Sequence, residues 1–289
     1  MENMNIQWFP GHMTKTRRFI QKTLPLVDVV VEVIDARVMK SSQNPDFDKL
    51  FEQKKRLLVI TKSDLADLGV TSAWLKFFKA NNKPALEVNA LFRKGADRVL
   101  PAVKELIAPK IENAQNRGMK KTVRMMLCGV PNSGKSTLIN ALCGRKAAAV
   151  EDRPGVTRAG QWISLGGGIE LLDTPGILWN KFDDIKTGLA LAFTGAIRDE
   201  VVDIQTLALH LIEFLKEHYV HLLGARYNIE ITDDLQPIDI YDRICIKRGF
   251  LLKGAEPDYE RCAAVLLDEF RAGRIGRISL EEPGNNADI

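Results

Sequence analysis

The chain has 289 residues, of which 45% are hydrophobic and 27% charged, and its 41 basic and 37 acidic residues leave a net charge of +4. This composition is that of an ordinary globular protein and excludes wholesale disorder, and the length predicts about two domains. A transmembrane helix is excluded because no apolar run reaches about 18 residues. The stretch from Met1 to Ile20 has no signal-peptide core, so we expect a cytoplasmic protein with no membrane partner.

The first half of the chain alternates short apolar runs with helical patterns. The apolar runs predict buried strands over residues 29–34, 57–60 and 85–88, with helices around 46–54 and 72–80. Nearly continuous apolar strands that alternate with helices are typical of a mostly parallel sheet with helices on both faces. The polar and basic stretch that follows, residues 108–122, is interpreted as a linking segment.

The second half changes from strand patterns to helical patterns. Strands are predicted over residues 123–129, 161–165 and 169–173, and helices over 201–223 and 259–271. The strand signal fades after Trp179. We therefore expect an α/β domain over residues 1–180 and a helical domain, with RNA as its expected ligand, over residues 181–289.

The strongest motif is the phosphate-binding loop Gly129-Val-Pro-Asn-Ser-Gly-Lys-Ser136, which a strand enters and a helical run leaves. Its glycines let backbone N–H groups surround phosphate oxygens, and the N-terminus of the following helix adds partial positive charge. Lys135 is expected to reach the β- and γ-phosphates, and the Ser136 hydroxyl to ligate Mg²⁺. The loop therefore predicts nucleotide contacts from Asn132, Ser133, Gly134, Lys135, Ser136 and Thr137.

A second motif, Asp173-Thr-Pro-Gly176, ends a predicted strand. The Asp173 carboxylate is expected to hold Mg²⁺ through water, and the Gly176 N–H to contact the γ-phosphate. Thr157 lies between the two motifs and is expected to complete the metal shell. The alternative for Thr157 is a loop threonine that only bonds its own backbone.

Two further segments are suited to reading a guanine base. In Thr61-Lys-Ser-Asp64, the Asp64 carboxylate can accept hydrogen bonds from guanine N1 and N2, while the Lys62 stem can lie over the base. Asn89-Ala90 can offer a backbone N–H to guanine O6. A lysine–aspartate pair after a strand is by itself an ordinary surface turn. The interpretation as a guanine-reading segment therefore depends on the presence of the phosphate-binding loop in the same chain.

These motifs resemble those of translation-factor-class GTPases, but their order is that of circularly permuted members. Together with further matching segments, they resemble the bacterial ribosome biogenesis GTPase A family over essentially the whole chain. The segments are Trp8–Met13, Asp35-Ala-Arg37, Asn44-Pro45, Asp152–Gly155 and Leu171–Trp179. The resemblance implies a circularly permuted P-loop GTPase domain with a C-terminal helical domain.

The chain departs from the family pattern at three positions. Thr61 stands where the family usually has Asn, and Met39 and Gln43 replace a usual Pro and Arg. Threonine occurs at the first position in Rho-type GTPases, so guanine selectivity is expected to survive. The other two changes bear on contacts of the 38–44 loop.

Hydrolysis needs a water aligned on the γ-phosphate, which many GTPases achieve with a Gln after the second motif. Here Ile177 and Leu178 follow Gly176, and neither can orient water. The resemblance implies that His12 does so, and imidazole chemistry suits this role. Asn132 is also of the residue type that helps bind K⁺ in potassium-dependent GTPases, although it can equally be a shaping residue of the loop.

The net charge conceals a polarised molecule. Residues 110–158 contain ten basic and three acidic residues, whereas residues 227–289 contain eight basic and thirteen acidic ones. Basic clusters favour RNA phosphates, with a solvated linker as the alternative. With the resemblance, we expect a monomeric GTPase that assembles the late large ribosomal subunit, binds its precursor and rRNA, and is stimulated by the particle. The alternatives are a GTPase of another RNA pathway and a nucleotide-gated binding module with little hydrolysis.

Overall fold

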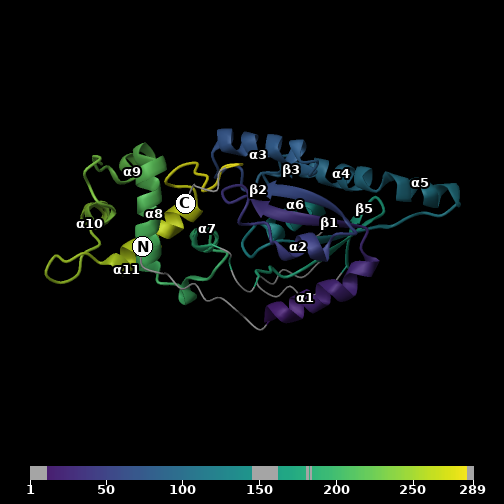
Figure 1. The fold of residues 1–289 in the computed structure, drawn as a ribbon, viewed down its shortest axis with the longest axis horizontal. Helices are drawn as coiled ribbons and strands as arrows, with labels where there is room; N and C mark the ends of the chain where they lie inside the picture. The colour runs from purple at the N-terminus through teal and green to yellow at the C-terminus, as the bar shows by residue number, and fades with distance from the viewer. Residues whose placement is uncertain (1–11, 145–161, 180–181, 183, 285–289) are drawn as a thin grey trace.

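The computed structural model describes residues 12–144, 162–179, 182 and 184–284. Within them, a six-stranded sheet with flanking helices forms one side of the molecule, and a group of helices forms the other (Figure 1). The strands run in the order β3-β2-β1-β4-β6-β5. Their bounds are β1 (Val29–Asp35), β2 (Lys55–Thr61), β3 (Ala85–Glu87), β4 (Val123–Cys128), β5 (Trp162–Gly166) and β6 (Ile169–Asp173).

The sheet is parallel except at one edge, where β5 pairs antiparallel with β6. All seven residues of β1 are buried, which explains why its sequence is apolar without alternation. The β5–β6 connection turns at Gly166–Gly168, three successive glycines with positive φ, a conformation that is strained for other residues. The expectation of a mostly parallel sheet is confirmed.

Helices cover both faces of the sheet, as predicted. Val29, Val31 and Val33 form a core with α4 (Val99–Leu106) and α6 (Lys135–Cys143). The opposite face packs against α1 (His12–Thr23), α2 (Asp46–Leu50) and α3 (Leu68–Ala80). Successive side chains of a strand point to opposite faces, so a continuous apolar run supplies both cores. Short 3₁₀ turns, at Leu24–Leu26, Ala96–Arg98 and Asp199–Val201, join some of these elements.

The segment expected to link the two halves begins as a helix. Ala108–Asn116 form α5, and residues 117–122 connect it to β4. None of the α5 side chains is buried. The helix therefore lacks the apolar stripe by which a packed helix is recognised in a sequence. Pro109, in its first turn, suits a helix start because the missing N–H would have no partner there.

The helical part contains α7 (Ile185–Phe193), α8 (Ile204–His218), α9 (Val220–Tyr227), α10 (Pro237–Arg248) and α11 (Tyr259–Arg271). The predicted helix over 201–223 is broken at Tyr219. The Tyr219 hydroxyl exchanges two hydrogen bonds of 3.1 Å with the Ser279 backbone. The break between the two helices thus coincides with a contact between residues 60 positions apart, which the apolar periodicity of the segment could not indicate.

The segment after α11 returns to the α/β part. Leu280 N donates to Arg37 O at 2.8 Å, and Ile278 N donates to Leu65 O at 3.0 Å. The Glu281 carboxylate accepts from the Lys40 backbone at 2.7 Å and from Ser41, and its burial raises its pKa. One apolar core also continues from the sheet into the helical part.

Among the described residues, no helix has the length and apolar character needed to cross a membrane.

Candidate nucleotide site

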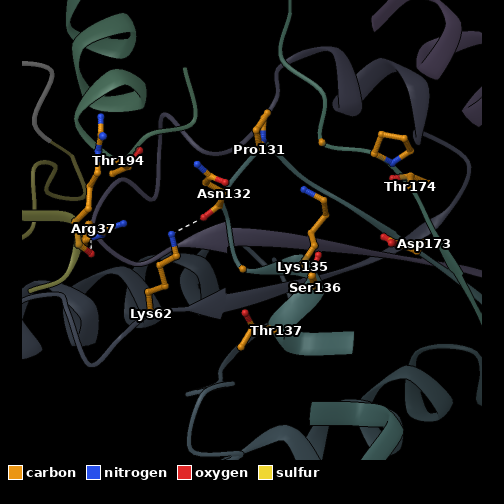
Figure 2. A pocket seen from close by; sticks show the side chains of 14 residues that line it. Arg37, Lys62, Pro131, Asn132, Lys135, Ser136, Thr137, Asp173, Thr174 and Thr194 are labelled. Carbon is orange, nitrogen blue, oxygen red and sulfur yellow. Dashed lines mark hydrogen bonds between the residues drawn. The ribbon is translucent and has the colours of Figure 1, made fainter. Parts of the chain in front are cut away.

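A polar cavity of about 490 Å³ opens at the edge of the sheet where the parallel strands end (Figure 2). Parallel α/β sheets bind ligands at this edge because the loops that leave the strands meet there. Both the predicted phosphate loop and the predicted metal motif contribute to the cavity. Its lining comprises Arg37, Lys62, Pro131, Asn132, Gly134, Lys135, Ser136, Thr137, Asp173, Thr174, Pro175, Gly176, Thr194 and Arg271.

The phosphate loop connects β4 to α6 in the predicted strand–loop–helix arrangement. Gly134 caps α6 with φ of 90°, so the loop ends at a helix N-terminus, where backbone N–H groups and the helix dipole attract anions. The buried Lys135 donates through Nζ to Val130 O at 2.7 Å and to Gly129 O at 3.2 Å. Burial lowers its pKa to about 8, against the opposing charge of Asp173. Ser133, a loop residue expected to contact nucleotide, is buried and does not line the cavity.

Ser136 and Asp173 both line the cavity and offer the oxygen ligands that Mg²⁺ prefers. Burial raises the pKa of Asp173, while Lys135 acts in the opposite direction. A divalent cation would stabilise the ionised carboxylate, so the donor set fits Mg²⁺. Thr157, the third predicted ligand, lies outside the described residues. Among the described residues, no group of three or more His, Cys, Asp or Glu side chains forms another metal site.

Gly176 packs directly against the phosphate loop. A Cβ atom at this position would lie 2.7 Å from Pro131 Cα, closer than real Cβ contacts occur. The next residue, Ile177, donates its N–H to Gly129 O at 3.2 Å. The metal motif and the phosphate loop are therefore held together by backbone, and only glycine fits between them. Ile177 and Leu178 are buried in the apolar core, so neither side chain reaches a water in the cavity.

Thr61 joins the segment predicted to read guanine to the phosphate loop. Its Oγ1 lies 2.5 Å from Ser133 O and 3.0 Å from Ile34 O. A hydroxyl has one proton, so it donates to one of these carbonyls at a time. Gly134 allows this approach, since a Cβ there would lie 3.1 Å from Thr61 Oγ1. The residue that departs from the family pattern thus makes a structural bridge beneath the loop.

Lys62 belongs to a buried charge network that sequence reasoning did not predict. Its Nζ lies 3.0 Å from Asp35 Oδ2 and donates to Asn132 O, the dashed line in Figure 2. Arg37 donates to both oxygens of Asp35, at 3.0 and 2.8 Å. Burial alone would raise the pKa of Asp35, but Arg37 and Lys62 outweigh it and hold that pKa well below its ordinary value. The network fixes the Lys62 ammonium beside the loop.

Asp64, Asn89 and Ala90 do not line the cavity, although they follow neighbouring strands at the same edge. The Val88 N–H donates to Ile60 O at 2.8 Å, which holds the two strand ends side by side. The phosphate and metal part of the predicted site is thus assembled in one cavity. Of the residues expected to contact guanine, Lys62 lines the cavity, whereas Asp64, Asn89 and Ala90 do not.

The helical part also contributes to the cavity, through Thr194 and Arg271. Arg271 makes a two-pronged ion pair with Asp199, with both distances 2.7 Å, and its carbonyl accepts from Arg37 at 3.2 Å. Asn132 donates its side-chain amide to Gly195 O. No local sequence pattern relates Thr194 or Arg271 to a nucleotide site, and the Asp35-Ala-Arg37 triplet points to one only through the family resemblance.

His12 is the first residue of α1, and its side chain lies outside what the structure describes. The other three histidines stand on α8 and α9. His210 contacts Glu213 at 3.3 Å, and the His218 ring packs at a tilt against Phe214, with 4.5 Å between ring centroids. These contacts agree with structural roles for His210 and His218.

The fold and the cavity define a P-loop GTPase in circularly permuted order, because the segment predicted to read guanine follows β2 and precedes the phosphate loop after β4. A family profile described as "50S ribosome-binding GTPase" matches residues 124–238, which include the phosphate loop and the metal motif. Ribosome biogenesis GTPase A of Priestia megaterium is 44% identical over 97% of this chain and 98% of its own length. The chain belongs to the ribosome biogenesis GTPase A family.

More distant relatives agree with this assignment. Ribosome biogenesis GTPase A of Thermotoga maritima is 32% identical over 96% of this chain and 95% of its own length. The crystal structure of GNP-bound YlqF from T. maritima superposes with a TM-score of 0.65 at 29% identity, covering 94% of this chain and 99% of that one. The protein is therefore a ribosome biogenesis GTPase that converts GTP to GDP and phosphate and uses Mg²⁺.

Proposed function

We propose that this GTPase is an assembly factor for the late large ribosomal subunit, whose turnover is stimulated by the particle it binds. The observation that carries the proposal is the lining of the phosphate cavity by the helical part. Thr194 and Arg271 line it, and Gly195 O accepts a hydrogen bond from Asn132 of the phosphate loop. A change of the bound nucleotide from GTP to GDP can therefore alter how the helical part is held.

Binding follows from the residues of the cavity. The Lys135 ammonium, the N-terminus of α6 and the backbone N–H groups of the loop would face the phosphates of a bound nucleotide, and this positive field would favour a triphosphate. Mg²⁺, held by Ser136 and by Asp173 through water, with Thr157 proposed as a further ligand, would neutralise phosphate charge. For the base, we propose contacts from Lys62, Asp64, Asn89 and Ala90.

Hydrolysis requires a group that orients the attacking water. The residues after Gly176 are apolar and buried, so they cannot supply it. We propose His12, delivered from the N-terminus of the chain, as this group. Engagement of the ribosomal particle would place His12 near the γ-phosphate and thereby couple docking to turnover, after which the GDP form dissociates.

The distribution of charge supports an rRNA partner. Asp28, at the edge of the sheet opposite the cavity, pairs with Lys121 at 2.8 Å and with Lys110 at 3.9 Å. Burial, together with Lys110 and Lys121, lowers the pKa of the neighbouring Lys54. Three ammonium groups around one carboxylate attract phosphate. Lys15, Arg17 and Arg18 add exposed positive charge on α1.

The test measures GTP hydrolysis with and without large ribosomal subunits, using wild type, His12→Ala and the control His221→Ala. His221 is exposed on α9, away from the cavity lining. We expect stimulation in the wild type and the control, and normal GTP binding without stimulated turnover in His12→Ala. Undiminished turnover in His12→Ala would refute the role of His12, and the absence of stimulation in all three proteins would refute the assembly cycle.

Co-sedimentation separates the remaining functional alternatives. An assembly factor binds immature large subunits in preference to mature ones, and more tightly with GTP than with GDP. A GTPase of another RNA pathway would show no preference for immature particles. A nucleotide-gated binding module would sediment with them but hydrolyse GTP at an unstimulated rate.

Two finer properties belong to the same proposal. The Asn132 amide oxygen is proposed to bind K⁺ beside the phosphates, and equal hydrolysis rates in KCl and NaCl would remove that role. We also propose a cytoplasmic monomer, whose mass light scattering would measure. Domain bounds of 1–180 and 181–289 are proposed with it, and limited proteolysis near residue 180 tests them.

A further inference from the structure

The loop after β3 carries two adjacent apolar side chains that the fold leaves in solvent. Phe92 is 71% exposed and Leu91 is 70% exposed, the highest values among the large apolar residues of the described chain. Single exposed apolar side chains are common on protein surfaces. A neighbouring pair at the tip of a loop, one of them aromatic, is less readily explained by chance.

Hydrogen bonds hold this tip in a defined conformation. Asn89 and Lys94 exchange two backbone hydrogen bonds of 3.0 Å, and the Asn89 side chain accepts from the Phe92 N–H at 3.1 Å. Gly95, with φ of 81°, closes the loop, and a Cβ there would lie 2.9 Å from Glu87 O. Phe92 is therefore presented to solvent by a preorganised hairpin, which lowers the entropy lost when a partner binds it.

The surroundings of Phe92 are basic. Residues 91–98 contain three cations, Arg93, Lys94 and Arg98, against one acid, Asp97. Arg93 and Lys94 are exposed, and neither takes part in an ion pair among the described residues. An exposed aromatic face beside free cations has the chemistry that binds single-stranded nucleic acid, since a base stacks on the ring while phosphates meet the cations.

We infer that the 91–94 tip is an RNA contact, in which an unpaired base stacks on Phe92 and the adjoining phosphates meet Arg93 and Lys94. The inference rests on the proposed function in naming RNA as the partner. The loop begins with Asn89 and Ala90, the residues proposed to read guanine. RNA bound at the tip therefore lies next to the base end of the nucleotide site rather than at the distant Asp28 cluster.

The test compares Phe92→Leu with Phe92→Trp, because leucine keeps apolar area but has no π-face. A fluorescent single-stranded RNA of about 12 nucleotides is one probe, and immature large subunits are the other. We expect Phe92→Leu to bind both roughly 5- to 100-fold more weakly and Phe92→Trp to bind within about twofold of wild type. Phe77→Leu, which makes the same change on α3, should bind as wild type does.

Two further readouts make the result specific. GDP affinity should be unchanged in Phe92→Leu, which shows that the Asn89–Ala90 segment is intact. Arg93→Gln should reduce the slope of log affinity against log salt by about one, as expected for a lost phosphate contact. Wild-type binding by Phe92→Leu would overturn the inference, since an apolar contact with protein would then suffice. If wild type binds the oligonucleotide but not immature particles, the proposed function fails while the RNA contact stands.

Discussion

The Asp35–Arg37 pair offers the most direct test of how this structure is held together. Arg37 is 1% exposed and Asp35 is 2% exposed. Replacing Arg37 by methionine keeps much of the side-chain volume but removes both hydrogen bonds to Asp35 and the bond to Arg271 O. The Asp35 carboxylate would then remain buried and, among the residues that the structure describes, would keep only Lys62 as an ionic partner, at 3.0 Å.

Removing one partner of a buried ion pair typically costs about 3–5 kcal/mol, because a charge is left without compensation. Lys62 offsets part of this, so we expect Arg37→Met to lower the free energy of unfolding by roughly 3 kcal/mol. Asp35→Asn should be destabilising for the same reason. The double variant contains neither charge, so it should be more stable than the sum of the single changes predicts, by about 1–3 kcal/mol.

Urea denaturation at about pH 7 gives the free energy of unfolding of wild type, the two single variants and the double variant, which together form a double-mutant cycle. The acid range adds a second check. Arg37 and Lys62 hold the pKa of Asp35 below its ordinary value, so its contribution to stability is present above about pH 4 and is lost as the pH falls further. The difference between wild type and Arg37→Met should therefore shrink in acid. A loss below about 1 kcal/mol, or strictly additive effects, would refute the reasoning.

Three further predictions concern the cavity. Binding of phosphate requires the charged form of Lys135, whose pKa is about 8. The affinity for GDP, measured by calorimetry, should therefore fall up to about tenfold per pH unit above pH 8. An affinity that stays constant up to about pH 9.5 would contradict this. Thr61→Val removes the hydroxyl between two buried carbonyls and should lower the free energy of unfolding by about 1–3 kcal/mol in urea, whereas Thr61→Ser should retain it. Gly176→Ala places a methyl group against the Pro131 backbone and should weaken GDP binding about tenfold or more; unchanged affinity would show that the loop can move away.

Several elements of the fold could be predicted because the pattern of their apolar residues follows from which side chains are buried. The strand at Val29–Asp35 agrees with expectation because its continuous apolar run reflects burial on both faces of the sheet, and the helix at Tyr259–Arg271 agrees because its apolar residues recur at helical spacing. The sequence does not indicate helix α5, because none of its residues is buried and they show no apolar stripe at helical spacing. The sequence does not indicate the break at Tyr219, because its hydrogen-bond partner, Ser279, is remote in the chain.

The candidate site divides in the same way. The phosphate loop could be predicted because a short, contiguous stretch contains both its glycines and its lysine, and its chemistry depends mainly on local backbone geometry. The contribution of Arg271 could not, because nothing near it in the sequence relates it to phosphate. It reaches the cavity only because α11 packs beside α7, where its guanidinium also donates to Phe193 O at 3.0 Å.

The sequence by itself determined the class of this protein, since the order and spacing of its local motifs specify a permuted GTPase. The tertiary structure alone decided how that GTPase connects to its helical part. Arg37 links Asp35 to the backbone of Arg271, and Asn132 links the phosphate loop to Gly195. The Arg37–Arg271 and Asn132–Gly195 contacts join residues 234 and 63 positions apart, and such pairs follow from the packing of whole elements, which no local pattern encodes.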